Sequence, residues 1–270
     1  MYVVPSVWRI TFIISDVDRF TLILNHLVKP NVHLLHIICQ VSCGAAHVVA
    51  LSEDGLLQAW GHNEYDQLGR GVTCQGLQGA CVINSYSKFL DEAPELVKIV
   101  KVSCGEYHSA AISEKGEVFT WGLGTLCQLG HCSLQYGNKE LVPRRVVALD
   151  GIFIKDVACG GVHTCAVTRK GALYAWSWGG SQAGQLGLGP QFGIFSCIPN
   201  KSELYLRNIP VLVVPTGVEL VACGHSHTLI CLRDGRNEEY KDGVTTITNR
   251  QLMRNLHMLG IHHRLIAMVE

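Results

Sequence analysis

VSCGAAHVVALSEDGLLQAWG, residues 41–61, is the first of four similar stretches in this 270-residue chain. The later copies read VSCGEYHSAAISEKGEVFTWG from Val102, VACGGVHTCAVTRKGALYAW from Val157 and VACGHSHTLICLRDG from Val221. Counted from Val41, successive copies begin 61, 55 and 64 residues apart, which is too long for a helical-hairpin repeat and suits a four-stranded unit. The sequence therefore predicts an all-β protein in which each copy builds one blade of a β-propeller.

Each copy carries the signal for a β-hairpin. In the first copy, an extended run over residues 46–52 is followed by the turn Glu53-Asp54-Gly55 and by a returning strand over 56–60. The glycine of this turn supplies the positive φ angle that a short hairpin loop needs. It recurs in every copy, as Gly55, Gly116, Gly171 and Gly235.

Three copies continue with Trp-Gly and then with Gln-Leu-Gly. The third is ambiguous, because counting forward from its turn glycine makes Trp176 the repeat tryptophan, whereas counting back from its Gln-Leu-Gly selects Trp178. Two extra residues have entered this strand, and we expect a local bulge, which keeps the facing of the side chains. We interpret the tryptophans as blade core. The signatures are Trp60-Gly61 with 67–69, Trp121-Gly122 with 128–130 and Trp178-Gly179 with 185–187.

Every copy also contains Cys-Gly-x-x-His, which offers soft metal ligands. Zinc needs four converging ligands, but each pair belongs to a different blade at the same register, so two pairs need not meet. We therefore predict no metal site. We expect each histidine to hydrogen-bond the backbone of its own or the neighbouring blade, and each glycine to permit a close approach. The positions are Cys43, Gly44 and His47; Cys104, Gly105 and His108; Cys159, Gly160 and His163; and Cys223, Gly224 and His227.

These residues resemble the regulator of chromosome condensation repeat family, most closely the plant members related to the ultraviolet-B receptor. The resemblance covers about residues 37–235. It implies a seven-bladed propeller, which needs roughly 350 residues or more, whereas this chain has 270. We therefore expect a partial propeller over residues 37–236, with three full blades and part of a fourth.

The two ends of the chain depart from the repeat pattern. Residues 1–36 are interpreted as an eroded blade or as unrelated sequence, and residues 237–270 as a tail in which 249–269 is either weakly amphipathic helix or disordered. An open ring leaves blade faces and strand edges uncovered. Self-association, a partner that completes the ring, folding back of the ends, and a truncated, poorly stable product all remain open as explanations.

The composition of the chain limits the classes of partner that we expect. Hydrophobic residues make up 48% of the chain and charged residues 16%, which is typical of a densely buried β protein. The chain has 22 basic and 22 acidic residues, so no net field attracts nucleic acid or a membrane surface. No targeting or membrane-spanning segment stands out, and we expect an intracellular protein of the nucleus or cytoplasm. We interpret the recurring cysteines among the chain's 12 as small buried side chains rather than a disulfide framework.

The sequence has no nucleotide-binding glycine motif and no catalytic constellation apart from the repeat residues, so it predicts neither an enzyme nor a cofactor.

Three functions implied by the resemblance remain. The residues favour a protein-interaction scaffold whose partner binds inter-blade loops. The alternative is guanine-nucleotide exchange, or chromatin-associated regulation, of a Ran-like small GTPase. Ultraviolet-B reception ranks third, because the family's motif tryptophans are absent. The loops concerned are 69–95, 130–146 and 187–208, and the tryptophan and arginine positions of the light-sensing motif are 45–46, 106–107, 161–162 and 225–226.

Overall fold

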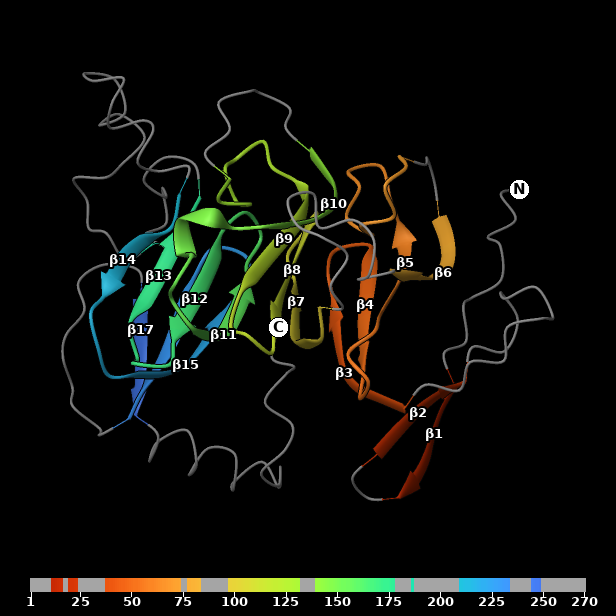
Figure 1. The fold of residues 1–270 in the computed structure, drawn as a ribbon, viewed down its shortest axis with the longest axis horizontal. Helices are drawn as coiled ribbons and strands as arrows, with labels where there is room; N and C mark the ends of the chain where they lie inside the picture. The colour runs from red at the N-terminus through yellow and green to blue at the C-terminus, as the bar shows by residue number, and fades with distance from the viewer. Residues whose placement is uncertain are drawn as a thin grey trace, which may run out of the picture.

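The protein is an array of β-sheets that stand side by side (Figure 1). The computed structural model describes residues 11–16, 19–23, 37–73, 77–83, 97–131, 139–177, 186, 209–233 and 244–248. Within this part of the chain, the secondary structure is β-strand apart from one short 3-10 helix, η1 (Val147–Leu149). The all-β, blade-by-blade architecture that the repeat spacing predicted is confirmed.

The first blade belongs to a six-stranded sheet with the order β1-β2-β3-β4-β5-β6. Its repeat strands pair antiparallel, and the β1-β2 hairpin joins the edge of β3, where Phe20 pairs with Ile38. Part of the segment 1–36 therefore extends the first blade. The strands are β1 (Thr11–Asp16), β2 (Arg19–Ile23), β3 (Ile37–Cys43), β4 (His47–Ser52), β5 (Leu57–His62) and β6 (Leu77–Ile83).

The second and third blades are four-stranded antiparallel sheets. In each, the hairpin predicted around the turn glycine forms the two central strands, and the outer strand comes from the variable segment that follows. The strands are β7 (Ile99–Cys104), β8 (His108–Ser113), β9 (Val118–Leu123) and β10 (Lys139–Arg145) in the second blade, and β11 (Ile154–Cys159), β12 (Thr164–Thr168), β13 (Leu173–Trp176) and β14 (Val211–Val214) in the third.

The fourth blade has three strands, and one of them is unusual. β15 (Val218–Cys223) and β16 (Thr228–Leu232) form the expected antiparallel pair. The strand beside β16 is β17 (Val244–Thr248), which runs parallel to β16, whereas the third strand of each preceding blade returns antiparallel. The prediction that the repeat fades after its last turn is therefore matched by a change of pairing. The helix or disorder considered for 249–269 lies outside the described residues, as does Gly235.

The first strands of successive blades, β3, β7, β11 and β15, contact one another along the array. The hairpin turns lie at one end of the strands and the Cys-Gly-x-x-His turns at the other, so the array has a hairpin face and a loop face. Three turn glycines have positive φ angles, 87° at Gly55, 80° at Gly116 and 85° at Gly171, which is the backbone that a short hairpin loop requires.

Buried apolar side chains gather between neighbouring sheets. Because strand side chains alternate, one strand serves two interfaces: Ala110 and Ile112 of β8 face the third blade, whereas Ala111 faces the first. Two fully buried tryptophans, Trp121 and Trp176, occupy successive interfaces. Full burial of one large apolar side chain contributes about 1.5–3 kcal/mol, so the blade interfaces, rather than the single sheets, hold the array together.

The ambiguity in the third copy is resolved in favour of counting forward from its turn glycine. Trp176 pairs with Thr164, and the β12–β13 ladder has no register shift up to that point. Ser177 is 2% exposed and donates to the carbonyl of Val162 at 2.6 Å. The β12–β13 ladder therefore shows no bulge up to Trp176. The rest of the segment in which we expect the bulge, including Trp178 and Gly179, lies outside the described residues.

Candidate functional site

The repeat histidines reach across the blade interfaces. His47 Nε2 lies 3.0 Å from Ser109 Oγ in the second blade, and His108 Nε2 lies 3.0 Å from Thr164 Oγ1 in the third. The third histidine makes the same contact with the fourth blade through Thr228 Oγ1, also at 3.0 Å. Sequence reasoning expected a backbone partner, whereas the Nε2 atom of all three histidines has a hydroxyl of the next blade as its partner.

The hydroxyl belongs to the residue that follows the histidine in the next copy. Copies two, three and four carry serine or threonine there, whereas Val48 takes the place in the first copy, which has no preceding repeat copy among the described residues. Sequence reasoning missed this position because it was searching for ligands and catalytic groups. The signal that could have found it is the change from valine to hydroxyl residues at one register.

The Gln-Leu-Gly segment supplies the acceptor for the same network. The carbonyl of Gln67 accepts hydrogen bonds from Ser109 Oγ at 3.0 Å and from Trp121 Nε1 at 2.9 Å. At the next interface, the carbonyl of Gln128 accepts from Thr164 Oγ1 at 2.8 Å and from Trp176 Nε1 at 2.9 Å. One carbonyl thus binds two side chains of the following blade.

This network decides the protonation of the histidines. A hydroxyl has one proton, and Ser109 and Thr164 give theirs to a carbonyl. Each therefore accepts from the histidine, which places a proton on Nε2 of His47 and of His108; burial of the rings disfavours a second, charging proton. Their Nδ1 atoms are buried without a hydrogen-bond partner. Burial lowers the pKa of His47 to about 4 and the pKa of His108 to about 3.

The glycine of Cys-Gly-x-x-His allows the blades to approach. A Cβ on Gly105 would collide with the ring of His108 and with the carbonyl of Gly160 in the next blade. Gly44 and Gly160 meet the equivalent atoms of their own histidine and of the following blade. At these three positions the absence of a side chain is what lets the histidine turn lie against the next sheet.

The two ends of the array leave this arrangement incomplete. Cys104 and Cys159 are buried at closed interfaces, whereas Cys43, at the same register in the first blade, is exposed. His227 is exposed, whereas the three preceding repeat histidines are at most 2% exposed. Trp60 is partly buried, whereas Trp121 and Trp176 are fully buried. The first and last described blades therefore present opposite halves of one kind of interface.

The interface between the third and fourth blades differs from the other two because it contains a second cysteine side chain. His163, Cys165 and Cys223 bring one nitrogen and two sulfurs within 4.8 Å of one another. The histidine of one Cys/His pair thus meets the cysteine of the next pair, which sequence reasoning did not foresee. Cys165 is the member that the repeat does not explain, because the equivalent positions are Val49 and Ala110 in the earlier blades.

The loop face carries an aromatic cluster between the first two blades. The rings of Tyr65 and Tyr107 meet edge to face at 4.8 Å between centroids, and Lys139 Nζ lies 5.4 Å from the Tyr65 ring centre. The backbone of Gly71 donates to the carbonyl of Leu141 at 2.8 Å, which ties the adjoining loop to β10. Val72 and Leu141 are 55% and 41% exposed. We call Tyr65, Val72, Tyr107, Lys139 and Leu141 the loop-face patch.

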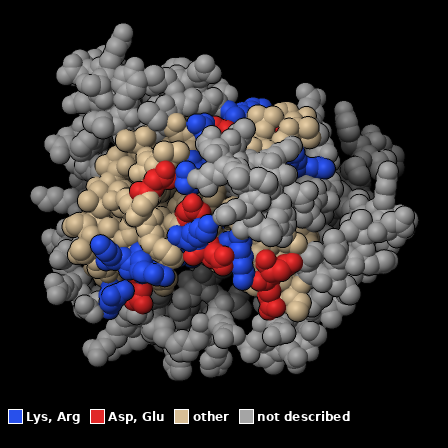
Figure 2. Space-filling view, viewed as in Figure 1, with Lys and Arg blue, Asp and Glu red and all other residues tan. Residues whose placement is uncertain are grey.

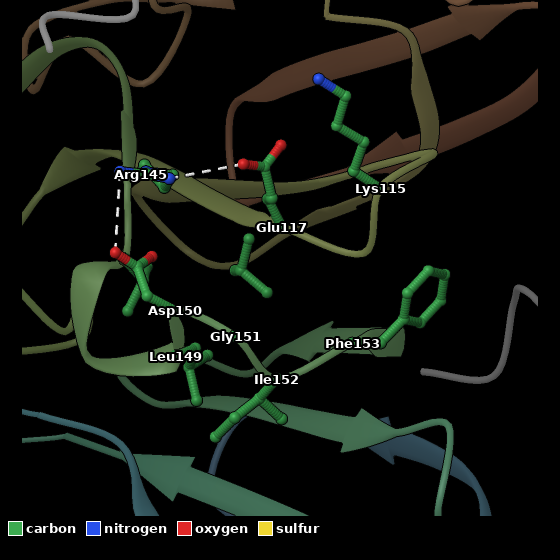
Figure 3. A pocket seen from close by; sticks show the side chains of 10 residues that line it. Lys115, Glu117, Arg145, Leu149, Asp150, Gly151, Ile152 and Phe153 are labelled. Atoms are coloured by element: carbon green, nitrogen blue, oxygen red, sulfur yellow. Dashed lines mark hydrogen bonds and ion pairs between the residues drawn. The ribbon is translucent and has the colours of Figure 1, made fainter. Parts of the chain in front are cut away.

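The hairpin face has a hollow of about 310 Å³ beside η1 (Figure 3). Arg145 lies in it between two carboxylates, 3.4 Å from Glu117 and 3.6 Å from Asp150. The cation is therefore already balanced by acidic neighbours. The wider surface shows the same balance, because basic and acidic side chains lie next to one another on the face seen in Figure 2. Neither feature favours a strongly charged ligand.

The fold and these interfaces define a repeat protein of the β-propeller class with an open array of blades. The family model for the regulator of chromosome condensation (RCC1) repeat matches residues 54–112, 115–167 and 171–231, and a second model of the same description matches 38–67, 99–126 and 154–185. The chain therefore belongs to the RCC1 repeat family.

Similar curated proteins extend well beyond this chain. The ultraviolet-B receptor UVR8 of Arabidopsis thaliana is 36% identical over 198 residues, which cover 72% of this chain and 39% of that protein. The probable E3 ubiquitin-protein ligase HERC6 of Homo sapiens is 34% identical over 201 residues, which cover 74% of this chain and 18% of that protein. The chain thus spans less than half the length of either.

Solved structures support the fold. Human WBSCR16 is 26% identical and superimposes with a TM-score of 0.56 over 74% of this chain and 46% of that one. Prp20p of Saccharomyces cerevisiae, 18% identical, superimposes with a TM-score of 0.58 over 95% of this chain and 61% of that one. The partial propeller expected from the repeats is confirmed. Among the described residues, no helix has the length and apolarity needed to cross a membrane.

Proposed function

We propose that the chain is a non-enzymatic protein-interaction scaffold built from RCC1 repeats. The observation that carries this proposal is the use of the recurring polar side chains: histidine, hydroxyl, tryptophan and the glutamine carbonyl bond one blade to the next. The polar side chains that recur from blade to blade therefore stabilise the contacts between blades. Selectivity for a partner then rests on the segments that differ between blades, which here hold the outer strands β6 and β10 and the connections that lead into them on the loop face.

The loop-face patch supports this proposal, because Val72 belongs to segment 69–95, and Lys139 and Leu141 of β10 belong to segment 130–146. It combines two tyrosines with two exposed aliphatic side chains, Val72 and Leu141, and aromatic and aliphatic anchors of this kind are enriched in protein interfaces. The patch lies within or beside loops 69–95 and 130–146. Loop 187–208, the third contact segment that the sequence suggested, lies outside the described residues and remains part of the proposal.

A pair of matched substitutions tests the patch. Val72 on the loop face and Val147 on the hairpin face are 55% and 56% exposed, so a charge introduced at either is tolerated similarly by the fold. We expect Val72→Asp to abolish capture of the partners that bind the unaltered chain, and Val147→Asp to retain it. Equal capture by both variants, measured by quantitative mass spectrometry of the bound proteins, would refute the proposed surface.

Self-association is a second mode of interaction that we propose for the open ends. The exposed Cys43 face of the first blade and the exposed His227 face of the fourth carry opposite halves of the interface that the inner blades share. A second copy, or a different propeller fragment, could stack on either end. Sedimentation velocity over a range of concentrations tests this, and a single monomeric species at every concentration would count against it.

The runner-up function is guanine-nucleotide exchange, or chromatin-associated regulation, of a Ran-like small GTPase. What supports it is the fold likeness to Prp20p, whose structure is described together with its binding to Gsp1p and histones. That likeness, at 18% identity, concerns the fold, and the chain covers 61% of Prp20p. Release of labelled GDP from a Ran-type GTPase is the test, and we expect no acceleration over the spontaneous rate.

Ultraviolet-B reception is the third candidate, on the basis of the 36% identity to UVR8. At the light-sensing motif this chain has Ala45-Ala46, Glu106-Tyr107 and their equivalents, and none carries an indole. We expect the same gel-filtration profile before and after ultraviolet-B exposure. For the site of action we propose the nucleus or the cytoplasm, which microscopy of the tagged chain would test.

A further inference from the structure

We propose that His163, Cys165 and Cys223 form a binding site for a zinc-type divalent cation between the third and fourth blades. The three side chains come from adjoining strands of two blades, β12 and β15, with His163 immediately before β12. Their ligand atoms lie within 4.8 Å of one another. His163 and Cys165 are fully buried, and Cys223 is half-buried. One imidazole and two thiols are the donors that zinc prefers in proteins.

A fourth polar atom lies among these ligands. Thr228 Oγ1 is 3.0 Å from His163 Nε2, 3.7 Å from Cys165 Sγ and 3.8 Å from Cys223 Sγ. Zinc binds sulfur at about 2.3 Å and histidine nitrogen at about 2.0–2.1 Å, so ligands at the corners of a tetrahedron stand about 3.3–3.8 Å apart. The separations from the threonine oxygen are close to this spacing. The hydroxyl, or a water in its place, completes a set of four ligands.

The charge balance favours a divalent cation. Binding releases the two thiol protons to solvent, and the resulting thiolates offset the two positive charges, so the occupied site is neutral. A neutral site suits a buried position, where an unbalanced charge is costly. The imidazole coordinates through Nε2 in its neutral form, with its remaining proton on Nδ1. No oxidation or reduction takes place.

The other interfaces provide an internal comparison. The interface between the second and third blades has the same histidine, cysteine and hydroxyl, in His108, Cys159 and Thr164, but Ala110 stands where the fourth-blade interface has Cys165. Two sulfurs are therefore present at one interface of the three. This is also the interface whose outer blade lacks the repeat tryptophan, since no Trp-Gly follows the last turn. A bound cation would fasten the two blades where that side chain is missing.

Cobalt(II) titration of the full chain tests the site, because tetrahedral thiolate coordination gives charge-transfer and intense visible absorption. The chain is purified with reductant, treated with chelator and then titrated. We expect one equivalent to bind, with displacement by zinc. Cys165→Ala should remove the charge-transfer absorption and weaken binding at least 100-fold, and Cys159→Ala, at the matched interface, should retain both. Circular dichroism confirms that each variant is folded.

A gain-of-site variant makes the test two-sided. Ala110→Cys places a second sulfur beside His108 and Cys159, and we expect it to bind a second equivalent of cobalt. The proposal is overturned if the folded, reduced chain takes up no cobalt, or if uptake is indifferent to Cys165→Ala. It is likewise overturned if mass spectrometry finds that a disulfide between Cys165 and Cys223 persists after treatment with reductant, because the ligands would then be unavailable.

Discussion

The middle of the array and its two ends are made of the same repeat and differ in what covers them. Between the second and third blades, His108, Thr164 and Trp176 are buried and joined through the Gln128 carbonyl. At the fourth blade His227 is exposed, and at the first blade Cys43 is exposed. The same side chains thus stabilise an interface or stand uncovered according to their neighbour. The energetic unit of this protein is therefore the interface rather than the blade.

The tryptophans should show the largest difference in stability between the middle of the array and its ends. Trp176 is fully buried and hydrogen-bonded, whereas Trp60 is partly buried beside the open face. We expect Trp176→Ala to lower the free energy of unfolding by about 3–5 kcal/mol, because a large buried side chain leaves a cavity. Trp60→Ala should lower it by less than half as much. Urea denaturation measures both, and equal losses would contradict the distinction.

The buried histidines predict loss of stability in acid. Unfolded histidine titrates near its usual pKa of 6.5, whereas the folded pKa is about 4 for His47 and about 3 for His108. Between these values the unfolded chain binds more protons, so the free energy of unfolding is highest above pH 6.5 and falls as the pH drops. The expected loss at pH 5 is about 2 kcal/mol for each histidine.

Thermal denaturation of variants across this pH range checks the origin of that loss. His108→Gln should make the slope between pH 6.5 and 5 shallower without abolishing it, since His108 no longer titrates but His47, whose folded pKa is also lowered, still does. A slope that is indifferent to His108→Gln would assign the acid sensitivity to other groups.

For the glycines of the Cys-Gly-x-x-His turns, we expect a smaller difference in the free energy of unfolding between the closed interface and the open end. A Cβ at Gly105 meets both its own histidine and the next blade, whereas at Gly224 the three nearest atoms all belong to the exposed His227. Gly105→Ala should cost about 2 kcal/mol, as overpacking at a closed interface does, and Gly224→Ala less, because His227 can swing into solvent. Chemical denaturation of the two variants side by side would reveal whether the order is reversed.

The hydroxyl position gives a last contrast, and its open-end variant has the smallest expected effect of all. Thr164→Val removes both a donor to the Gln128 carbonyl and an acceptor for His108, at a cost of about 1–3 kcal/mol. The reciprocal change, Val48→Thr at the open end, adds a hydroxyl that has no preceding repeat blade to bind and should alter stability by less than about 0.5 kcal/mol. Stabilisation by Val48→Thr would indicate that another element covers that face.

Much of this architecture could be predicted from the sequence because it is repeated. The hairpins and turn glycines could be predicted because four copies show the same pattern, whereas the partial ring followed from the family resemblance together with the length of the chain. The position of the fourth blade's third strand could not be predicted, since β17 lies beyond the last repeat residue and pairs parallel to β16. Pairing between distant segments depends on which strand edges are still free in the folded array, and a local sequence pattern does not contain that information.

The candidate site shows a second reason for the limits of prediction. The sequence gives the order of residues within a blade, but His163 and Cys223 meet because blades stack with a fixed offset. Because the sequence does not reveal that offset, we could predict only a backbone hydrogen-bond partner for the histidine, and the hydroxyl partner was overlooked. Trp176 could be separated from Trp178 only once the strand pairing was visible.

Native-state labelling of the repeat cysteines tests the central claim most directly. Cys43, Cys104 and Cys159 share one register, yet the first is exposed and the other two are buried, and burial raises the pKa of the Cys104 thiol to about 12. With a small thiol reagent and peptide mass spectrometry, Cys43 should react in the folded chain, whereas Cys104 and Cys159 should react at least 1,000-fold more slowly, through unfolding alone, as expected for a domain stable by about 4 kcal/mol or more. Comparable rates for all three would contradict an array that is closed in the middle and open at its ends.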